Sequence, residues 1–208
     1  MNTKTSVLII EDEKNICDFI ATALLNQDYR VFKSYSGTDG ISQITSRCPD
    51  ILLLDLGLPD MDGMDIIREV RQWSSMPIIV ISARTQEEEK VLALDAGADD
   101  YITKPFGTSE LLARIRTAVR HLSGANGQGN QTHTFEAHGL VIDFDRRRIF
   151  VHDQEVHLTQ VEYKIVSMLA KNSGKVITYD TLISHVWGPY ADDNNRILRV
   201  NMANIRRK

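Results

Sequence analysis

The stretch ILLLDLGLPDMDG, residues 51–63, places four aliphatic residues directly before Asp55 and follows it with a loop rich in glycine, proline and aspartate. A carboxylate left unpaired at the end of a buried strand is costly, because burial removes water from its charge. We therefore expect Asp55 to have either a charged partner or a chemical role at this strand end. The surrounding sequence indicates which of these applies.

Short aliphatic runs alternate with helical patterns throughout residues 1–122. Apolar residues recur at helical spacing after the first run, and again in the final helix at Leu111, Ile115, Ala118, Val119 and Leu122. The aliphatic runs predict strands at Val7–Ile10, Val31–Phe32, Ile51–Leu54, Ile78–Ile81 and Tyr101–Ile102. Five strands alternating with five helices predict an α/β, doubly wound five-stranded parallel sheet.

Charged and polar residues follow these predicted strands. In such a sheet ligands bind at the carboxyl ends of the strands, where Glu11, Asp12, Asp55, Ser82 and Lys104 fall. Converging carboxylates need a cation, and an all-oxygen site with few ligands suits Mg²⁺. Asp55 is then best placed to attack phosphorus, while Lys104 and Ser82 hold phosphoryl oxygens. Taken singly, Lys104 as a loop lysine and Ser82 as a strand terminator are ordinary alternatives.

The second half of the chain has a different organisation. Residues 123–134, which include SGANGQGNQT, predict a flexible linker, and residues 135–208 predict a second domain. Within it LVIDFD, RIFV and EVHL predict short antiparallel strands. A helix follows, with Thr159 and Glu162 as a capping box and Gly174 as its end. Helices at about 179–187 and 194–208 complete an α+β helix-turn-helix module.

Composition narrows the class of protein. The content of 42% hydrophobic and 25% charged residues is typical of a soluble globular protein. No apolar run approaches the ~18 residues of a membrane helix, and residues 1–4 lead directly into a predicted strand, so we expect a cytoplasmic protein with no membrane partner. Cys17 and Cys48 lack metal-ligand spacing and are interpreted as partly buried free thiols.

Charge divides the chain into an acidic and a basic half. Up to Leu122, 13 Lys and Arg face 19 Asp and Glu, a net charge of −6, whereas the remainder carries +2. Within the last predicted helix, basic residues occupy a sector of roughly 120°, and we expect Ile197, Leu198, Val200, Met202 and Ile205 to pack inward. The basic face predicts contacts with double-stranded DNA through Arg196, Arg199, Arg206 and Arg207; a merely solvated basic face is the alternative.

Four motifs, VLIIEDEKNI, LLLDLGLPDMDG, VISAR and GADDYITKPF, resemble in order and spacing the receiver domain of two-component response regulators. The resemblance implies a flavodoxin-like receiver at residues 1–122, in which Asp55 takes phosphate from a sensor histidine kinase. It also implies that Lys104 pairs the phosphate, that Ser82 and Tyr101 form a switch, and that the Lys104–Pro105 bond is cis. Mg²⁺ would be bound by Glu11 through water, Asp12, Asp55 and the carbonyl group of Gly57.

The same resemblance implies a homodimer through the fourth helix, fifth strand and fifth helix. The residues concerned are Lys90, Asp99, Asp100, Glu110 and Arg114. A two-fold contact would pair Lys90 with Glu110 and Asp100 with Arg114 across subunits. Pairing of Glu110 with Arg114 inside one helix is the alternative, at i, i+4 spacing. A third salt bridge across the dimer would involve Asp99. His121 occupies the position that often carries the arginine partner of this residue, so whether that bridge forms is left open.

Residues 158–188 resemble the winged-helix effector of the OmpR/PhoB family, and the whole chain follows that family's plan. DLGLPD, VRQWS and VWGP favour a subgroup that regulates potassium-uptake genes. Residues 188–194 match a loop that such proteins offer to RNA polymerase. The family continues into a C-terminal β-hairpin wing, so a chain ending at Lys208 is expected to be truncated before its wing.

Three functions are consistent with these observations. The favoured one is a phosphorylation-switched transcription factor that binds DNA as a dimer. The second is a truncated regulator that accepts phosphate and dimerises but does not bind DNA productively. The third is a phosphatase acting through an aspartyl phosphate. Gly57 stands where one phosphatase class has its acid/base carboxylate, and no substrate pocket is evident, so we do not expect an enzyme.

Overall fold

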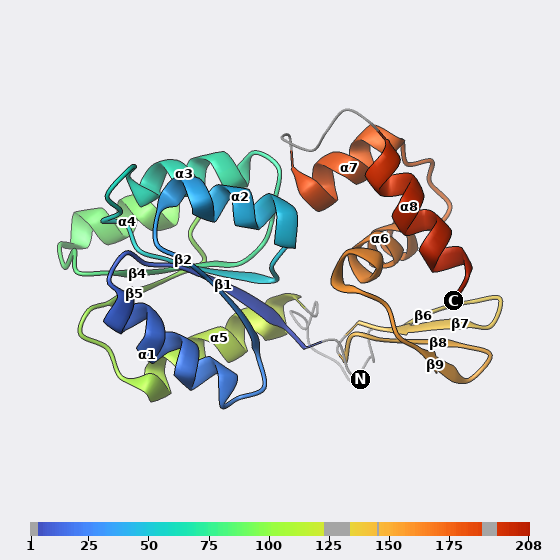
Figure 1. Cartoon of the computed structure of the whole chain (residues 1–208), viewed down its shortest axis with the longest axis horizontal. Coiled ribbons are helices and arrows are strands. Elements are labelled where there is room, and N and C mark those ends of the chain that lie inside the picture. The colour runs from blue at the N-terminus through green and yellow to red at the C-terminus, as the bar shows by residue number, and fades with distance from the viewer. Residues whose placement is uncertain (1–3, 123–133, 145, 189–194) are drawn as a thin grey trace. The chain divides into compact units, whose positions relative to one another are not determined.

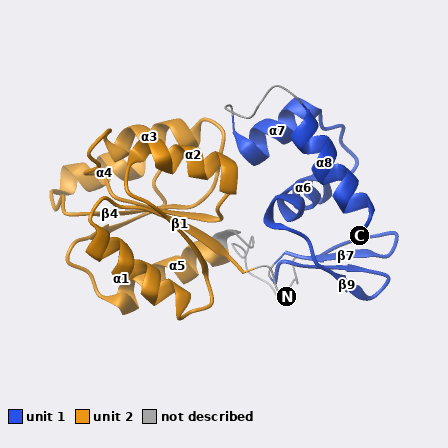
Figure 2. Ribbon diagram, in the orientation of Figure 1, with its two compact units in different colours: residues 1–3, 123–208 blue, residues 4–122 orange. Residues whose placement is uncertain are grey.

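The computed structural model describes residues 4–122, 134–144, 146–188 and 195–208 (Figure 1). The chain divides into two compact units, one of which is Lys4–Leu122, while the other holds the described C-terminal residues (Figure 2). Each unit has its own sheet, one of five strands and one of four. No described helix is long and apolar enough to cross a membrane.

The first unit contains the predicted parallel sheet. Its strands lie in the order β2-β1-β3-β4-β5, and all neighbouring pairs are parallel. The strands are β1 (Ser6–Ile10), β2 (Arg30–Ser34), β3 (Ile51–Leu54), β4 (Ile78–Ser82) and β5 (Asp100–Thr103). Ile10 pairs with Leu54, and Leu54 pairs with Val80. The carboxyl ends of the three central strands therefore lie at one edge of the sheet.

Helices cover both faces of this sheet. α1 and α5 lie on one face, and α2, α3 and α4 lie on the other (Figure 1). Their bounds are α1 (Lys14–Leu25), α2 (Gly37–Arg47), α3 (Gly63–Arg71), α4 (Glu87–Asp95) and α5 (Thr108–Leu122). Alternate strand residues enter separate apolar clusters, with Leu8 and Leu52 in one and Val7 and Ile51 in the other. A strand buried on both faces is therefore mostly aliphatic, as the central strands are apart from Ser6 and Ser82 at their ends. Cys17 and Cys48 are both buried thiols, whereas the sequence predicted partial burial.

The second unit begins with a four-stranded antiparallel sheet in chain order. The strands are β6 (Thr134–Ala137), β7 (Leu140–Asp143), β8 (Arg148–Val151) and β9 (Gln154–Val156). The last three are the predicted strands. β6 was not predicted, and its first residue, Thr134, lies within the segment expected to be linker. The rest of that segment, residues 123–133, lies outside the described residues.

Three helices follow: α6 (Gln160–Lys171), α7 (Tyr179–Trp187) and α8 (Arg196–Arg206). The predicted capping box is present, because the Thr159 hydroxyl accepts from the Glu162 N–H and the Glu162 carboxylate accepts from the Thr159 N–H. α6 nevertheless ends at Lys171 rather than at Gly174. The side-chain amide of Asn172 donates to the Met168 carbonyl at 2.9 Å and so satisfies one carbonyl of the last turn. Lys208, just after α8, pairs with Glu162 at the start of α6.

Candidate functional site

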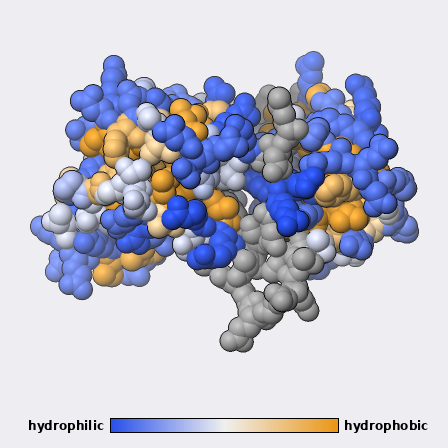
Figure 3. Space-filling model, turned by 90° about the horizontal axis from the view of Figure 1, so that it is seen from below, coloured by the Kyte–Doolittle hydropathy of each residue, from blue (hydrophilic) through white to orange (hydrophobic). Residues whose placement is uncertain are grey.

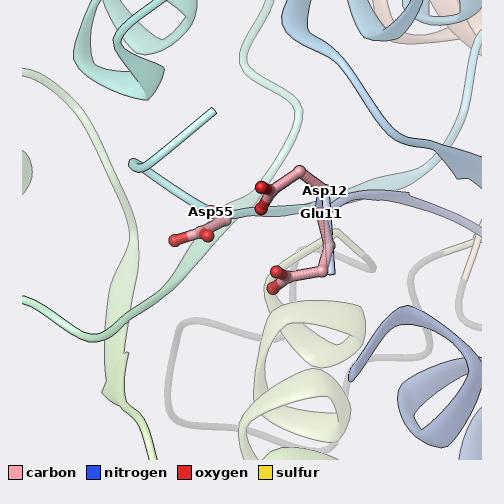
Figure 4. Close-up of side chains that lie close together, drawn as sticks. All are labelled: Glu11, Asp12 and Asp55. Carbon is pink, nitrogen blue, oxygen red and sulfur yellow. The ribbon is translucent and has the colours of Figure 1, made fainter. Parts of the chain in front are cut away.

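Three carboxylates converge at the carboxyl edge of the parallel sheet. Glu11 and Asp12 follow β1, and Asp55 follows its neighbour β3, so that all three side chains lie close together (Figure 4). Their oxygen atoms lie within 4.8 Å of one another; Glu11 and Asp55 are buried and Asp12 is exposed. These are hard oxygen donors of the kind that Mg²⁺ prefers, with one of them open to solvent. The donor set therefore fits the expected magnesium site.

Lys104 supplies the positive charge of this pocket. Its Nζ lies 2.7 Å from Glu11 Oε2 and 3.1 Å from Asp55 Oδ2, and its side chain is only 11% exposed. The exposed carboxylate of Glu13 is farther away, at 3.9 Å. Lys104 directly follows β5, and its bond to Pro105 is cis, as expected. In this structure Lys104 thus pairs with both buried carboxylates at once.

Burial and mutual repulsion control protonation in the pocket. The pKa of Glu11 is raised to about 7, chiefly by burial and also by the charge of Asp55, against the lowering effect of its hydrogen bond to Lys104. Burial lowers the pKa of Lys104, but its hydrogen bonds to Glu11 and Asp55 outweigh burial and raise it overall. One ammonium group therefore does not fully compensate two buried carboxylates, and added positive charge would stabilise the pocket.

Two glycines lie next to Asp55. A Cβ atom on Gly57, the expected carbonyl ligand, would lie 3.8 Å from Asp55 Oδ2, so this residue borders the carboxylate. A Cβ atom on Gly63, the first residue of α3, would lie 2.5 Å from the Asp55 carbonyl oxygen, which is too close for any contact. Gly63 therefore brings the amino terminus of α3 against the backbone of Asp55. Sequence reasoning did not identify this role of Gly63.

The expected switch residues, Ser82 and Tyr101, are both linked to Arg84. The Arg84 N–H donates to Ser82 Oγ at 3.2 Å, and the Tyr101 hydroxyl donates to the Arg84 carbonyl at 2.9 Å. The Arg84 side chain also pairs with Asp62 at 3.2 Å. Burial raises the pKa of Tyr101, whose ring packs against the apolar cluster on the α2–α4 side of the sheet. Tyr101 thus lies partly inside the unit.

Four of the residues expected at a dimer interface, Asp99, Asp100, Glu110 and Arg114, form ion pairs within the single chain. Arg114 binds Asp100 at 2.8 Å and Glu110 at 3.0 Å. Asp99 pairs with Arg71 at 2.7 Å, a partner that the sequence did not suggest. Lys90 is partly exposed on α4, and the side chain of His121 lies outside the described residues. The pairing of Glu110 with Arg114 inside one helix, left open above, is present here.

α8 carries the four arginines expected to bind DNA, and all four are exposed. The expectation for its apolar residues was partly wrong. Leu198 is buried, whereas Ile197 and Val200 are 43% and 53% exposed. At 100° per residue, Val200 lies about 160° from Leu198 and Ile197 about 100° from it, so the inward face is narrower than predicted. The loop expected to meet RNA polymerase, apart from Gly188, lies outside the described residues.

Two family models match the chain. The response regulator receiver domain matches residues 7–116, and the C-terminal domain of transcriptional regulatory proteins matches residues 153–208. The first match covers the carboxylate pocket, including Lys104. The second covers the three C-terminal helices, including the exposed arginines of α8.

Individual relatives share both domains. The KDP operon transcriptional regulatory protein KdpE of Escherichia coli (strain K12) is 44% identical over 98% of this chain and 89% of that protein. The response regulator ArlR of Staphylococcus aureus (strain Mu50) is 37% identical over 98% of this chain and 90% of that protein. The crystal structure of DrrB, an OmpR/PhoB homologue of Thermotoga maritima, has a TM-score of 0.51 and 26% identity over 99% of this chain and 89% of DrrB. The chain belongs to the OmpR/PhoB family of two-component response regulators, with an N-terminal receiver and a C-terminal DNA-binding domain.

Proposed function

We propose that this protein is switched on by phosphorylation of Asp55 and then controls transcription by binding DNA as a dimer. The observation that carries the proposal is the ammonium group of Lys104 between the buried carboxylates of Glu11 and Asp55. A structural role alone would not require two buried carboxylates that share one ammonium group, with a third, exposed carboxylate beside them. Binding of a phosphoryl group and a divalent cation would explain why Lys104 and the three carboxylates lie together in one pocket.

In the proposed reaction, an oxygen of Asp55 attacks the phosphorus atom of a phosphohistidine on the sensor kinase. The new P–O bond forms as the P–N bond breaks, and the leaving imidazole takes up a proton. Lys104 then pairs with a phosphoryl oxygen in place of the free Asp55 carboxylate. Bound Mg²⁺, held by Asp12, Asp55 and the Gly57 carbonyl and by Glu11 through water, would supply positive charge against the phosphoryl oxygens.

The switch would act through Ser82, Arg84 and Tyr101. A phosphoryl group on Asp55 offers strong acceptors to the Ser82 hydroxyl, which here accepts from the Arg84 N–H. Movement of Ser82 would alter the loop whose carbonyl holds Tyr101 and so bias one of two packings. Dimerisation through α4, β5 and α5 would then exchange the intrachain pairs of Arg114 for pairs across subunits. Asp99 pairs with Arg71 within the chain, so this pair too would open if Asp99 joins Lys90, Asp100, Glu110 and Arg114 at the interface.

The proposed output is sequence-specific binding of double-stranded DNA through α8. Its exposed arginines can neutralise phosphates and contact guanine edges. The likeness to KdpE supports potassium-transport genes as targets, with the loop at residues 188–194 as the contact for RNA polymerase. These partners would place the working protein in the cytoplasm.

Intact-mass spectrometry after incubation with acetyl phosphate and Mg²⁺ tests the phosphoacceptor. We expect the wild-type chain to gain one phosphoryl group, and the Asp55→Asn variant and a sample with EDTA to gain none. Asp65→Asn, which changes an exposed carboxylate on α3, is the matched control and should label normally. Labelling of Asp55→Asn to the wild-type extent would remove Asp55 from this role.

A further inference from the structure

Two exposed aliphatic side chains interrupt the basic surface of α8. Ile197 is 43% exposed and Val200 is 53% exposed. Isolated exposed apolar residues are common on protein surfaces, and Figure 3 shows apolar patches scattered over a largely hydrophilic face. The position of Val200 on the helix is more informative than its exposure alone, because it determines what Val200 would meet when α8 binds a ligand.

Val200 lies near the centre of the outward surface of α8. The helix is anchored by Leu198, which is 1% exposed, and Val200 lies about 160° around the helix from it. Ile197 lies only about 100° from Leu198 and is therefore on the flank. The methyl groups of Val200 thus project away from the body of the domain, whereas Ile197 projects sideways.

Positive charges lie on this outward surface above and below Val200. Arg196 precedes it by about one turn and Arg207 follows two turns later, while Arg199 lies on the flank opposite Ile197; all three are exposed. Within the described part of the chain, none of these guanidinium groups forms an ion pair. From residue 194 to residue 208 the sequence contains no acidic residue. The charge around Val200 is therefore complementary to a polyanion, and on the proposed function that polyanion is duplex DNA.

A helix that enters the major groove with arginines on its rim brings its central side chains against the base edges. The apolar group available there is the C5-methyl group of thymine, which cytosine lacks. We propose that Val200 contacts the C5-methyl group of a thymine and so selects thymine at one position of each DNA half-site. This inference rests on the proposed DNA-binding function and specifies which base its central side chain recognises.

The test removes the methyl group from the DNA and the side chain from the protein. A duplex is first selected from a randomised pool with the full chain activated by beryllofluoride and Mg²⁺. Each thymine is then replaced in turn by deoxyuridine, which lacks only the C5-methyl group. Burying one methyl group contributes about 0.8 kcal/mol, so we expect wild-type affinity to fall about fourfold at one position of each half-site.

The Val200→Ala variant should bind the thymine and deoxyuridine duplexes with nearly equal affinity at that position. Two variants serve as matched controls. Ile197→Ala removes an exposed aliphatic side chain from the flank of the same helix and should retain the fourfold difference. Arg199→Ala should weaken binding to every duplex and flatten its salt dependence, and should also retain the difference. Circular dichroism checks that each variant is folded.

A fourfold difference that persists in Val200→Ala, or that disappears only in Ile197→Ala, would overturn the assignment to Val200. Wild-type binding that is insensitive to every deoxyuridine would overturn the thymine contact altogether, while leaving DNA binding itself intact. Failure to select any duplex would be a separate result, because it would contradict the proposed DNA-binding function and this inference with it.

Discussion

The ammonium group of Lys104 lies within 3.1 Å of carboxylate oxygens on both Glu11 and Asp55, in a pocket where all three side chains are nearly buried. Taking charges out of water is costly, and the remaining member of a broken buried pair bears that cost alone. Phosphorylation of Asp55 would change which oxygens Lys104 meets without removing its partner. Lys104 thus contributes both to the stability of the receiver and to its proposed chemistry.

We predict that Lys104→Ala lowers the free energy of unfolding by about 3 kcal/mol without Mg²⁺, because Glu11 and Asp55 lose their cation. Added Mg²⁺ should recover part of this loss and should stabilise the variant more than the wild type. Urea unfolding with and without Mg²⁺ measures both effects. Lys33→Ala is the control, because its pair with Asp18 is largely exposed and should contribute less than about 1 kcal/mol. A Lys104 variant as stable as the Lys33 variant would contradict this account.

Asp60 links the loop after β3 to the start of α2. Hydrogen bonds from the Thr38 N–H, the Thr38 hydroxyl and the Gly37 N–H lower the pKa of Asp60 from 3.8 to about 2. A carboxyl group whose pKa is lower in the folded state binds fewer protons there than in the unfolded chain. Its contribution to stability is therefore fully present above about pH 4 and disappears as the pH falls through about 2.

We predict that Asp60→Asn lowers the urea midpoint at neutral pH, and that the difference from the wild type shrinks as the pH falls from about 4 to about 2. The asparagine amide has one acceptor oxygen where the carboxylate has two and carries no charge. Asp65→Asn, whose carboxylate pairs with one exposed arginine, should change the midpoint much less. An Asp60→Asn difference that is constant across this pH range would show that the lowered pKa is not the source of its stability.

Residues that follow directly on buried strands could be predicted to form the pocket, because the ends of parallel strands meet at one edge of the sheet. Arg71 and Arg84 could not be predicted in this way. Arg71 binds Asp99, 28 residues later, and Arg84 binds Asp62, 22 residues earlier. Such contacts depend on how α3 and its flanking loops pack, which no local spacing encodes.

At the scale of elements, aliphatic runs located all five parallel strands to within two residues. The three central strands gave the longest runs because they are buried on both faces, whereas the edge strands β2 and β5 are only partly buried and gave two-residue runs. β6 was missed because TFEA contains only two apolar residues and directly follows a polar, glycine-rich segment. The inward face of α8 was overestimated for a different reason. Hydrophobicity was taken to mean burial, whereas Val200 lies at about 160° from Leu198 and is exposed.

The start of α3 leaves no room for a side-chain atom at Gly63. We predict that Gly63→Ala destabilises the receiver by about 1–3 kcal/mol, because its Cβ would lie 2.5 Å from the backbone of Asp55. Displacement of α3 should also slow labelling of Asp55 by acetyl phosphate. Gly107→Ala is the control, since no atom lies within 4 Å of its added Cβ, and it should be neutral or slightly stabilising. Equal stability and labelling of the two variants would refute the close approach at Gly63.

At the scale of the whole molecule, the chain joins an acidic receiver to a second part that has a net positive charge and carries the arginine-rich helix. The net charge up to Leu122 is −6, and beyond it +2, so attraction to DNA is local to the second unit. Phosphorylation of the receiver can change DNA binding only if it favours one of two states of the molecule that differ in their affinity for DNA. The dimer would be the state with higher affinity, because two linked DNA-binding domains that engage two half-sites gain avidity without any new DNA contact.

The central claim is tested most directly by the Kd of the chain for its selected duplex, with and without beryllofluoride and Mg²⁺, at two salt concentrations. We expect activation to tighten binding of the wild type by at least tenfold and to leave the Asp55→Asn variant unchanged. Binding of both should weaken as salt rises, because α8 displaces counterions from the DNA. Equal tightening of Asp55→Asn, or no response of the wild type to beryllofluoride, would contradict control of DNA binding by phosphorylation of Asp55.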